Sequence, residues 1–167
     1  LGLSGGIDSS FLALKVKEFK LRPLVVHVDA GWNSELAVSN IQKVIDYCDF
    51  DLHTEVIDWE VMKELQLAYF KSGICNQDVP QDHVFFASLY HFATKNNIKY
   101  ILSGGNYATE SIFPESWKGS AMDSINLKAI YKYYTGKKLK NYQTINFFQY
   151  YILFPFYYGM RTVRPLN

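Results

Sequence analysis

Near the start of the chain stands the stretch Ser4-Gly5-Gly6-Ile7-Asp8-Ser9-Ser10, and it decides the fold. Leu1-Gly2-Leu3 before it predicts the end of a strand, and the apolar spacing after it predicts a helix. A Gly/Ser loop between a strand and a helix is typical of a phosphate-binding site. Glycine lets the backbone approach an anion, and the first amides of the helix point toward it. The alternative is an ordinary turn in which Asp8 and Ser9 cap a helix.

Asp8 indicates a divalent cation at this loop. A carboxylate next to a phosphate repels it unless a cation lies between them. The loop also lacks the lysine of the ATPase pattern G-x-x-x-x-G-K-[ST]. We therefore expect Asp8 to hold magnesium beside a bound phosphate.

Downstream of the loop, short apolar runs alternate with segments of helical spacing. We expect strands at 23–29, 51–57, 100–102 and 162–166. We expect one helix that Ser34 and Glu35 open and three further helices at 59–70, 80–95 and 124–134. This alternation predicts an α/β fold, a doubly wound parallel sheet with helices on both faces that binds its ligand at the carboxyl ends of the strands. Because the sequence starts and stops inside predicted strands, we expect residues 1–167 to form a single domain, truncated at both ends, of a longer chain.

The composition is that of a globular domain. The chain has 167 residues, of which 49% are hydrophobic and 20% charged. A net charge of +1 gives no electrostatic excess for holding a nucleic-acid backbone, so we expect no nucleic-acid partner. Cys48 and Cys75 form neither a disulfide scaffold nor a C-x-x-C zinc motif, which favours a cytoplasmic location. An oligomer is compatible with these features.

Three further segments carry candidate site residues. The strand end His27-Val28-Asp29 is expected to meet a nucleotide base and ribose, although Asp29 has an alternative role as a cap. A second glycine-rich strand end, Ser103-Gly104-Gly105-Asn106, continues to Glu110 and supplies oxygens for substrate or metal, or else it is an ordinary turn. Asp82 and His83 offer an acid or base, with the alternative that they only fill a first helical turn.

Residues 142–160 are rich in Phe and Tyr and include no charged side chain. Polar residues, Pro155 and Gly159 interrupt the stretch, so it is a poor membrane-spanning helix. We expect it to be buried or covered by a partner protein, and we expect no membrane span.

The stretch 4–10 resembles the SGGxDS pyrophosphate loop of the N-type ATP pyrophosphatases. This resemblance implies an adenine nucleotide alpha hydrolase-like fold and cleavage of ATP between its α and β phosphates, which leaves AMP on an oxygen of the substrate. It also implies that ATP and magnesium are the cofactors, with the nucleotide bound by two loops and one strand end. The residues so assigned are Ser4, Gly5, Gly6, Asp8, Ser9, Ser10, His27, Val28, Asp29, Ser103, Gly104 and Gly105.

Four further motifs, at 80–83, 103–110, 114–117 and 163–167, make the chain similar to the N-acetyl sugar amidotransferases of surface-polysaccharide biosynthesis. That family resemblance implies conversion of the acetamido group of a nucleotide-linked sugar into an acetamidino group, in bacterial O-antigen (lipopolysaccharide) or flagellar glycan synthesis. It implies Asp8, Asn106 and Glu110 as catalytic residues. Asp82, His83 and Arg164 are the candidates for substrate binding. Ammonia would come from a separate glutaminase, often accompanied by a cyclase-like protein.

Two alternatives remain open. One is a sulfurtransferase that thiolates tRNA or a small molecule, which Cys75 favours, but the low net charge and the sequence G-G-N-Y-A-T-E in place of G-H-N-x-D-D argue against it. The other is a nucleotide-binding module that does not cleave ATP. Intact Asp8 and two glycine loops argue against that second alternative.

Overall fold

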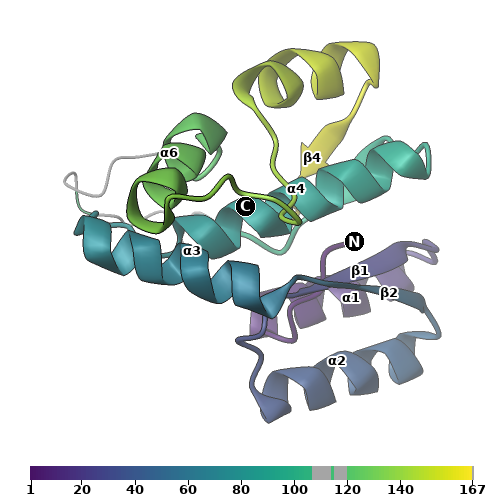
Figure 1. Cartoon of the computed structure of the whole chain (residues 1–167). Helices are drawn as coiled ribbons and strands as arrows, with labels where there is room; N and C mark the ends of the chain where they lie inside the picture. The colour runs from purple at the N-terminus through teal and green to yellow at the C-terminus, as the bar shows by residue number, and fades with distance from the viewer. Residues whose placement is uncertain (107–113, 115–119, 167) are drawn as a thin grey trace.

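The computed structural model describes residues 1–106, 114 and 120–166 (Figure 1). Its helices are α1 (Ile7–Glu18), α2 (Glu35–Cys48), α3 (Trp59–Ser72), α4 (Val79–Lys95), α6 (Ser124–Thr135) and the π-helical segment η2 (Gln149–Tyr157). Its strands are β1 (Leu24–Asp29), β2 (Asp51–Val56), β3 (Tyr100–Leu102) and β4 (Arg161–Val163). The predicted order of elements from the first helix up to residue 102 is confirmed, with boundaries that differ by one or two residues. The strand end predicted at Leu1–Leu3 is an isolated bridge and not a strand.

The strands form two parallel two-stranded sheets, in which β1 pairs with β2 and β3 pairs with β4. The predicted α/β class with parallel strands is confirmed, but the strands do not form the one doubly wound sheet that was expected. The reason lies in Leu1–Leu3, which has room for only an isolated bridge, Gly2 to Val26, before the chain turns into the loop. This segment nevertheless hydrogen-bonds on both sides: Leu3 N–H donates to Val26 O at 3.0 Å and Gly2 N–H donates to Leu102 O at 3.1 Å.

Side-chain caps set the helix boundaries that the sequence predicts. Ser34 Oγ accepts from the Ala37 N–H at 3.1 Å and starts α2. Asp58 and Asp123 accept backbone N–H groups at the starts of α3 and α6 in the same way. Gly73 ends α3 in the left-handed conformation, which costs glycine little.

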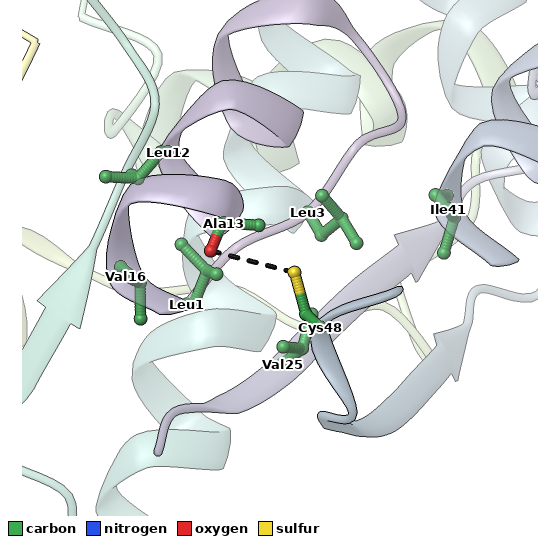
Figure 2. Close-up of a cluster of buried hydrophobic side chains, with 8 residues drawn as sticks. All are labelled: Leu1, Leu3, Leu12, Ala13, Val16, Val25, Ile41 and Cys48. Carbon is green, nitrogen blue, oxygen red and sulfur yellow. Dashed lines mark hydrogen bonds between the residues drawn. The ribbon is translucent and has the colours of Figure 1, made fainter. Parts of the chain in front are cut away.

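One face of β1 packs against α1 and α2. Figure 2 shows this cluster, in which the Cys48 thiol donates to the Ala13 carbonyl oxygen at 3.8 Å. Its buried members are Leu1, Leu3, Leu12, Ala13, Val16, Val25, Ile41 and Cys48. Cys48 is therefore a core residue, as its place on a predicted helix face indicates.

The other face of β1 packs against α3 and α4. Val26 and Val28 are buried there with Met62 of α3 and Val84 of α4. Figure 1 shows α2 on one side of the β1–β2 pair and α3 with α4 on the other. Burial of β1 on both faces explains why its sequence is a continuous apolar run.

The aromatic stretch 142–160 is divided between core and surface. Ile145, Phe154 and Met160 are buried in a cluster with residues of α4. Phe147, Phe148, Phe156 and Tyr157 are exposed. Among the helices within the described residues, none combines the length and the apolar character that crossing a membrane requires.

Leu65 and Leu67 of α3 offer a matched test of this packing. Leu65 is fully buried between α3 and α6, whereas Leu67 is about half exposed, at 49%. Leu65→Ala should lower the free energy of unfolding by about 2–5 kcal/mol because it leaves a cavity. Leu67→Ala should cost under about 1 kcal/mol, and urea denaturation of both variants measures the difference. Similar losses for the two variants would contradict the packing of α3 on α6.

Candidate functional site

The predicted phosphate loop is held in shape by its contact with α2. Gly5 has a φ of +77°, and a Cβ there would lie 2.3 Å from the Ala37 carbonyl oxygen. The Asn40 side-chain amide donates to the Gly5 carbonyl at 3.2 Å. Gly5 is thus required for both its conformation and its lack of a side chain.

Ser9 ties the loop together from the first turn of α1. Its buried hydroxyl donates to the Gly6 carbonyl at 3.2 Å and accepts from the Ser4 N–H at 3.2 Å. Ser4 Oγ lies 3.1 Å from the same hydroxyl. The first amides of a helix have no carbonyl partner within it, so the start of α1 can offer N–H donors to a ligand next to Ser4 and Gly6.

The second glycine-rich loop contacts the first one. A Cβ on Gly104 would lie 2.8 Å from Ser9 N, so the two loops meet at backbone distance. Asn106 Nδ2 donates to Asp8 Oδ2 at 2.9 Å. Two segments 98 residues apart in sequence therefore converge on the carboxylate predicted to hold magnesium. Glu110 lies outside the described residues.

A pocket of about 460 Å³ opens at this junction. Its volume falls in the range of small-molecule sites. Many of the predicted nucleotide-binding residues line it, and these are Ser4, Gly6, Asp8, Ser9, His27, Val28, Ser103, Gly104 and Gly105. Gly5, Ser10 and Asp29 are not among its lining residues. The Asp29 carboxylate instead accepts the Gly31 N–H at 2.8 Å and stabilises the turn after β1.

α4 supplies a wall of the pocket from which only Asp82 was predicted as a site residue. Gln81, Phe85 and Leu89 line this wall together with Asp82 and Phe86. Positions 81, 85 and 89 follow helical i, i+4 spacing, which is the signal that would have identified this face. Asn33, in the loop after β1, also lines the pocket and was not predicted to do so.

His83 lies away from the pocket lining. It is fully buried, its Nδ1 donates to the Ala121 carbonyl at 2.7 Å, and its Nε2 accepts the Ile145 N–H at 3.2 Å. Burial lowers the pKa of the His83 imidazole below its ordinary value because it disfavours the charged form. The structure thus brings Asp82, but not His83, to the pocket. Arg164 is exposed just after β4 and is not among the lining residues either.

The acidic residues of the pocket fit a magnesium–phosphate ligand. Asp8 and Asp82 are its lining carboxylates. Magnesium in phosphate sites takes one or two protein carboxylates and completes its coordination with phosphate oxygens and water. Among residues 1–106, 114 and 120–166, no cluster of three or more His, Cys, Asp or Glu side chains forms a dedicated metal cage.

The contact between the loop and α2 predicts that alanine lowers the free energy of unfolding more at Gly5 than at Gly73, although both glycines have a positive φ. Gly5 has backbone atoms of Ala37 within reach of a Cβ, whereas Gly73, with a φ of +66°, has open space. Gly73→Ala should lower the free energy of unfolding by about 1 kcal/mol, from conformation alone. Gly5→Ala should cost about 2–4 kcal/mol because α2 must also move. Chemical denaturation measures both variants, and equal losses would mean that α2 does not restrain the loop.

The environment of His83 predicts a loss of stability in acid. Because its folded-state pKa lies below the ordinary value of about 6.5, the unfolded chain binds the proton more readily. The free energy of unfolding should therefore fall as the pH drops below about 6.5. His83→Gln should be less stable at pH 7 but show a shallower decline between pH 7 and 5 in urea titrations. An unchanged slope would show that His83 is not the titrating group.

Comparison with known proteins assigns the chain to no family. The sequence matches no family model, and no curated protein matches it. Residue chemistry and geometry are therefore what support the proposals that follow.

Proposed function

We propose that this protein is an ATP-dependent amidotransferase that acts on an N-acetylated, nucleotide-linked sugar. In this proposal it adenylates the acetamido oxygen and replaces it with ammonia, as a cytoplasmic enzyme of bacterial O-antigen or flagellar glycan synthesis. The observation that carries the proposal is the 2.9 Å hydrogen bond between Asn106 and Asp8 at the start of α1. It joins the two glycine-rich loops at a pocket that a nucleotide fits.

The order of the parallel segments supports a nucleotide site at this place. Hydrogen bonds give the order β2, β1, Leu1–Leu3, β3, β4. We propose that this is the core of a doubly wound fold, in which the chain leaves Leu1–Leu3 toward β1 on one side and later toward β3 on the other. Ligands of such folds bind at the carboxyl ends of the strands where the direction reverses, which is where the pocket lies.

Each part of the pocket has a role in the proposed reaction. The amides at the start of α1 and the Ser4 hydroxyl would hold the β and γ phosphates, while Ser9 keeps the loop in shape through its hydrogen bonds to Ser4 and Gly6. Magnesium, when bound at Asp8, would offset the charge of the departing pyrophosphate. Asn106 orients the Asp8 carboxylate through its amide. Asp82, from the first turn of α4, faces the same pocket and is our candidate for a contact with the sugar.

The chemistry explains why ATP is needed. An amide carbon is a poor electrophile and its oxygen a poor leaving group. Attack of the acetamido oxygen on the α-phosphorus of ATP expels pyrophosphate and places AMP on that oxygen. Ammonia then forms the new C–N bond, and the C–O bond breaks as AMP leaves with the oxygen.

Ammonia is proposed to come from a separate glutaminase that acts together with a cyclase-like protein. The aromatic residues of 142–160 provide the proposed docking surface, because Phe147, Phe148 and Phe156 are exposed. Aromatic side chains are enriched at the centre of protein interfaces. Cys75, which would favour a thiolating enzyme, is exposed and is not among the residues that line the pocket.

The products of ATP cleavage test the proposal. With magnesium, ammonia and a panel of nucleotide-linked N-acetylhexosamines, the protein should release AMP and pyrophosphate, because the loop lacks the lysine of γ-phosphate-cleaving loops. Separation of the nucleotides by ion-exchange chromatography measures the products. ADP and phosphate as the main products would contradict the proposal. Tight ATP binding without turnover on any acceptor would favour the non-catalytic alternative.

Asp8→Ala should reduce this turnover by at least about 100-fold, because the cation loses its protein ligand. The fold should persist, since Asp8 lies in the first turn of α1 and is only half-buried. Asp46→Ala is the matched control, because Asp46 is exposed on α2, where its carboxylate accepts a hydrogen bond from the Gln42 side chain. Circular dichroism verifies the fold of both variants. Equal turnover by the two variants would remove Asp8 from the mechanism.

A further inference from the structure

A chain of hydrogen bonds links the start of the fold to the side chain of Asn33. His27 is buried in β1, and its Nδ1 lies 3.0 Å from the Leu3 carbonyl oxygen. A carbonyl oxygen only accepts, so Nδ1 carries the proton. The other ring nitrogen, Nε2, is then an acceptor in the neutral ring. Asn33 Nδ2 lies 3.1 Å from it, so Asn33 must donate to His27 through its NH₂ group.

These two hydrogen bonds, from His27 to Leu3 and from Asn33 to His27, fix the orientation of the Asn33 amide. An asparagine side chain otherwise exchanges its oxygen and nitrogen by a simple rotation. With one N–H of Nδ2 held by His27, Oδ1 is the acceptor that Asn33 can offer to a ligand in the pocket that it lines. No donor to Oδ1 is found within the part of the chain that the structure describes.

The Asn33 acceptor and the apolar part of the pocket suit a planar ring and not a phosphate. The Asn33 carbonyl oxygen would repel phosphate oxygens, and the phosphates have their own donors at the start of α1. Apolar side chains of Val26, Val28, Phe85 and Leu89 line the same pocket as Asn33. A heterocyclic base with a hydrogen-bond donor on its edge satisfies both the apolar walls and the Asn33 acceptor.

We infer that Asn33 selects the base of the nucleotide, with Oδ1 accepting a hydrogen bond from the exocyclic 6-amino group of adenine. His27 is a positioning residue that acts through Asn33. A purine with only hydrogen at position 6 offers no donor there and loses this hydrogen bond. The inference rests on the proposed function, because it assumes that a nucleotide occupies this pocket.

Two triphosphates measure this selection by isothermal titration calorimetry with the full chain and magnesium. ATP has the 6-amino group, and purine riboside triphosphate has hydrogen in its place. The native protein should bind ATP about three- to tenfold more tightly than purine riboside triphosphate, which is the effect of one neutral hydrogen bond.

Asn33→Ala should bind ATP and purine riboside triphosphate with equal affinity while it still binds inorganic pyrophosphate as the native protein does. Asn96→Ala is the matched control. Its amide donates to the Phe92 carbonyl at the end of α4, and Asn96 does not line the pocket. That variant should keep the native preference for ATP.

A double-mutant cycle tests the role of His27. His27→Phe keeps a ring in β1 but removes both ring nitrogens, so it should reduce the preference for ATP in the same direction. Adding Asn33→Ala to His27→Phe should then cause little further loss, because the two residues act as one unit. Additive losses would overturn the positioning role of His27. If His27→Phe does not fold, the comparison of Asn33→Ala with Asn96→Ala still decides the assignment of Asn33.

The outcomes separate this inference from the proposed function. If the native protein binds no nucleotide triphosphate, the proposed function fails first. If it binds ATP but Asn33→Ala keeps the native preference over purine riboside triphosphate, only the assignment of Asn33 fails. If Asn33→Ala loses the distinction between ATP and 2′-deoxy-ATP instead, the amide contacts ribose and the base assignment is overturned.

Discussion

The backbone of Leu1–Leu3 hydrogen-bonds to β1 on one side and to the end of β3 on the other, and the rest of the structure depends on this double contact. Leu3 N–H donates to Val26 O, and Gly2 N–H donates to Leu102 O. The contact sets the loop at 4–10 between the end of β1 and the loop that follows β3. The Leu3 carbonyl also accepts from His27, so the same three residues orient a side chain of the pocket.

Two close contacts between backbone segments shape the candidate site. Gly5 lies against Ala37 of α2, and Gly104 lies against Ser9 of α1. A methyl group at either place would meet backbone atoms, which cannot rotate away as a side chain can. The absence of side chains at these two positions lets α1 begin at the junction of both loops. The Asp8–Asn106 hydrogen bond then closes that junction.

Much of the fold was predictable because its signals are local. The continuous apolar run of β1, the Ser34 cap of α2 and the glycine that follows α3 each act within a few residues. Residues 142–160 could not be resolved in this way. Phe and Tyr are spread along the whole stretch, and only packing against α4 separates the buried Phe154 from the exposed Phe156. The pairing of strands in two sheets was equally beyond local signals, because pairing depends on hydrogen bonds between distant segments.

By itself the sequence determined the glycine-rich loop at 4–10, the parallel α/β class and about half of the residues that line the pocket, because glycine, serine and strand-end positions have strong local preferences. Only the tertiary structure decided which polar residues reach the pocket. Asp82 and His83 are neighbours in sequence, yet Asp82 lines the pocket and His83 is buried with both ring nitrogens bonded. Successive residues of a helix point about 100° apart, so the packing of α4 selects between them. The role of Asn33 likewise arises from His27 and Leu3, which chain folding alone brings to its side.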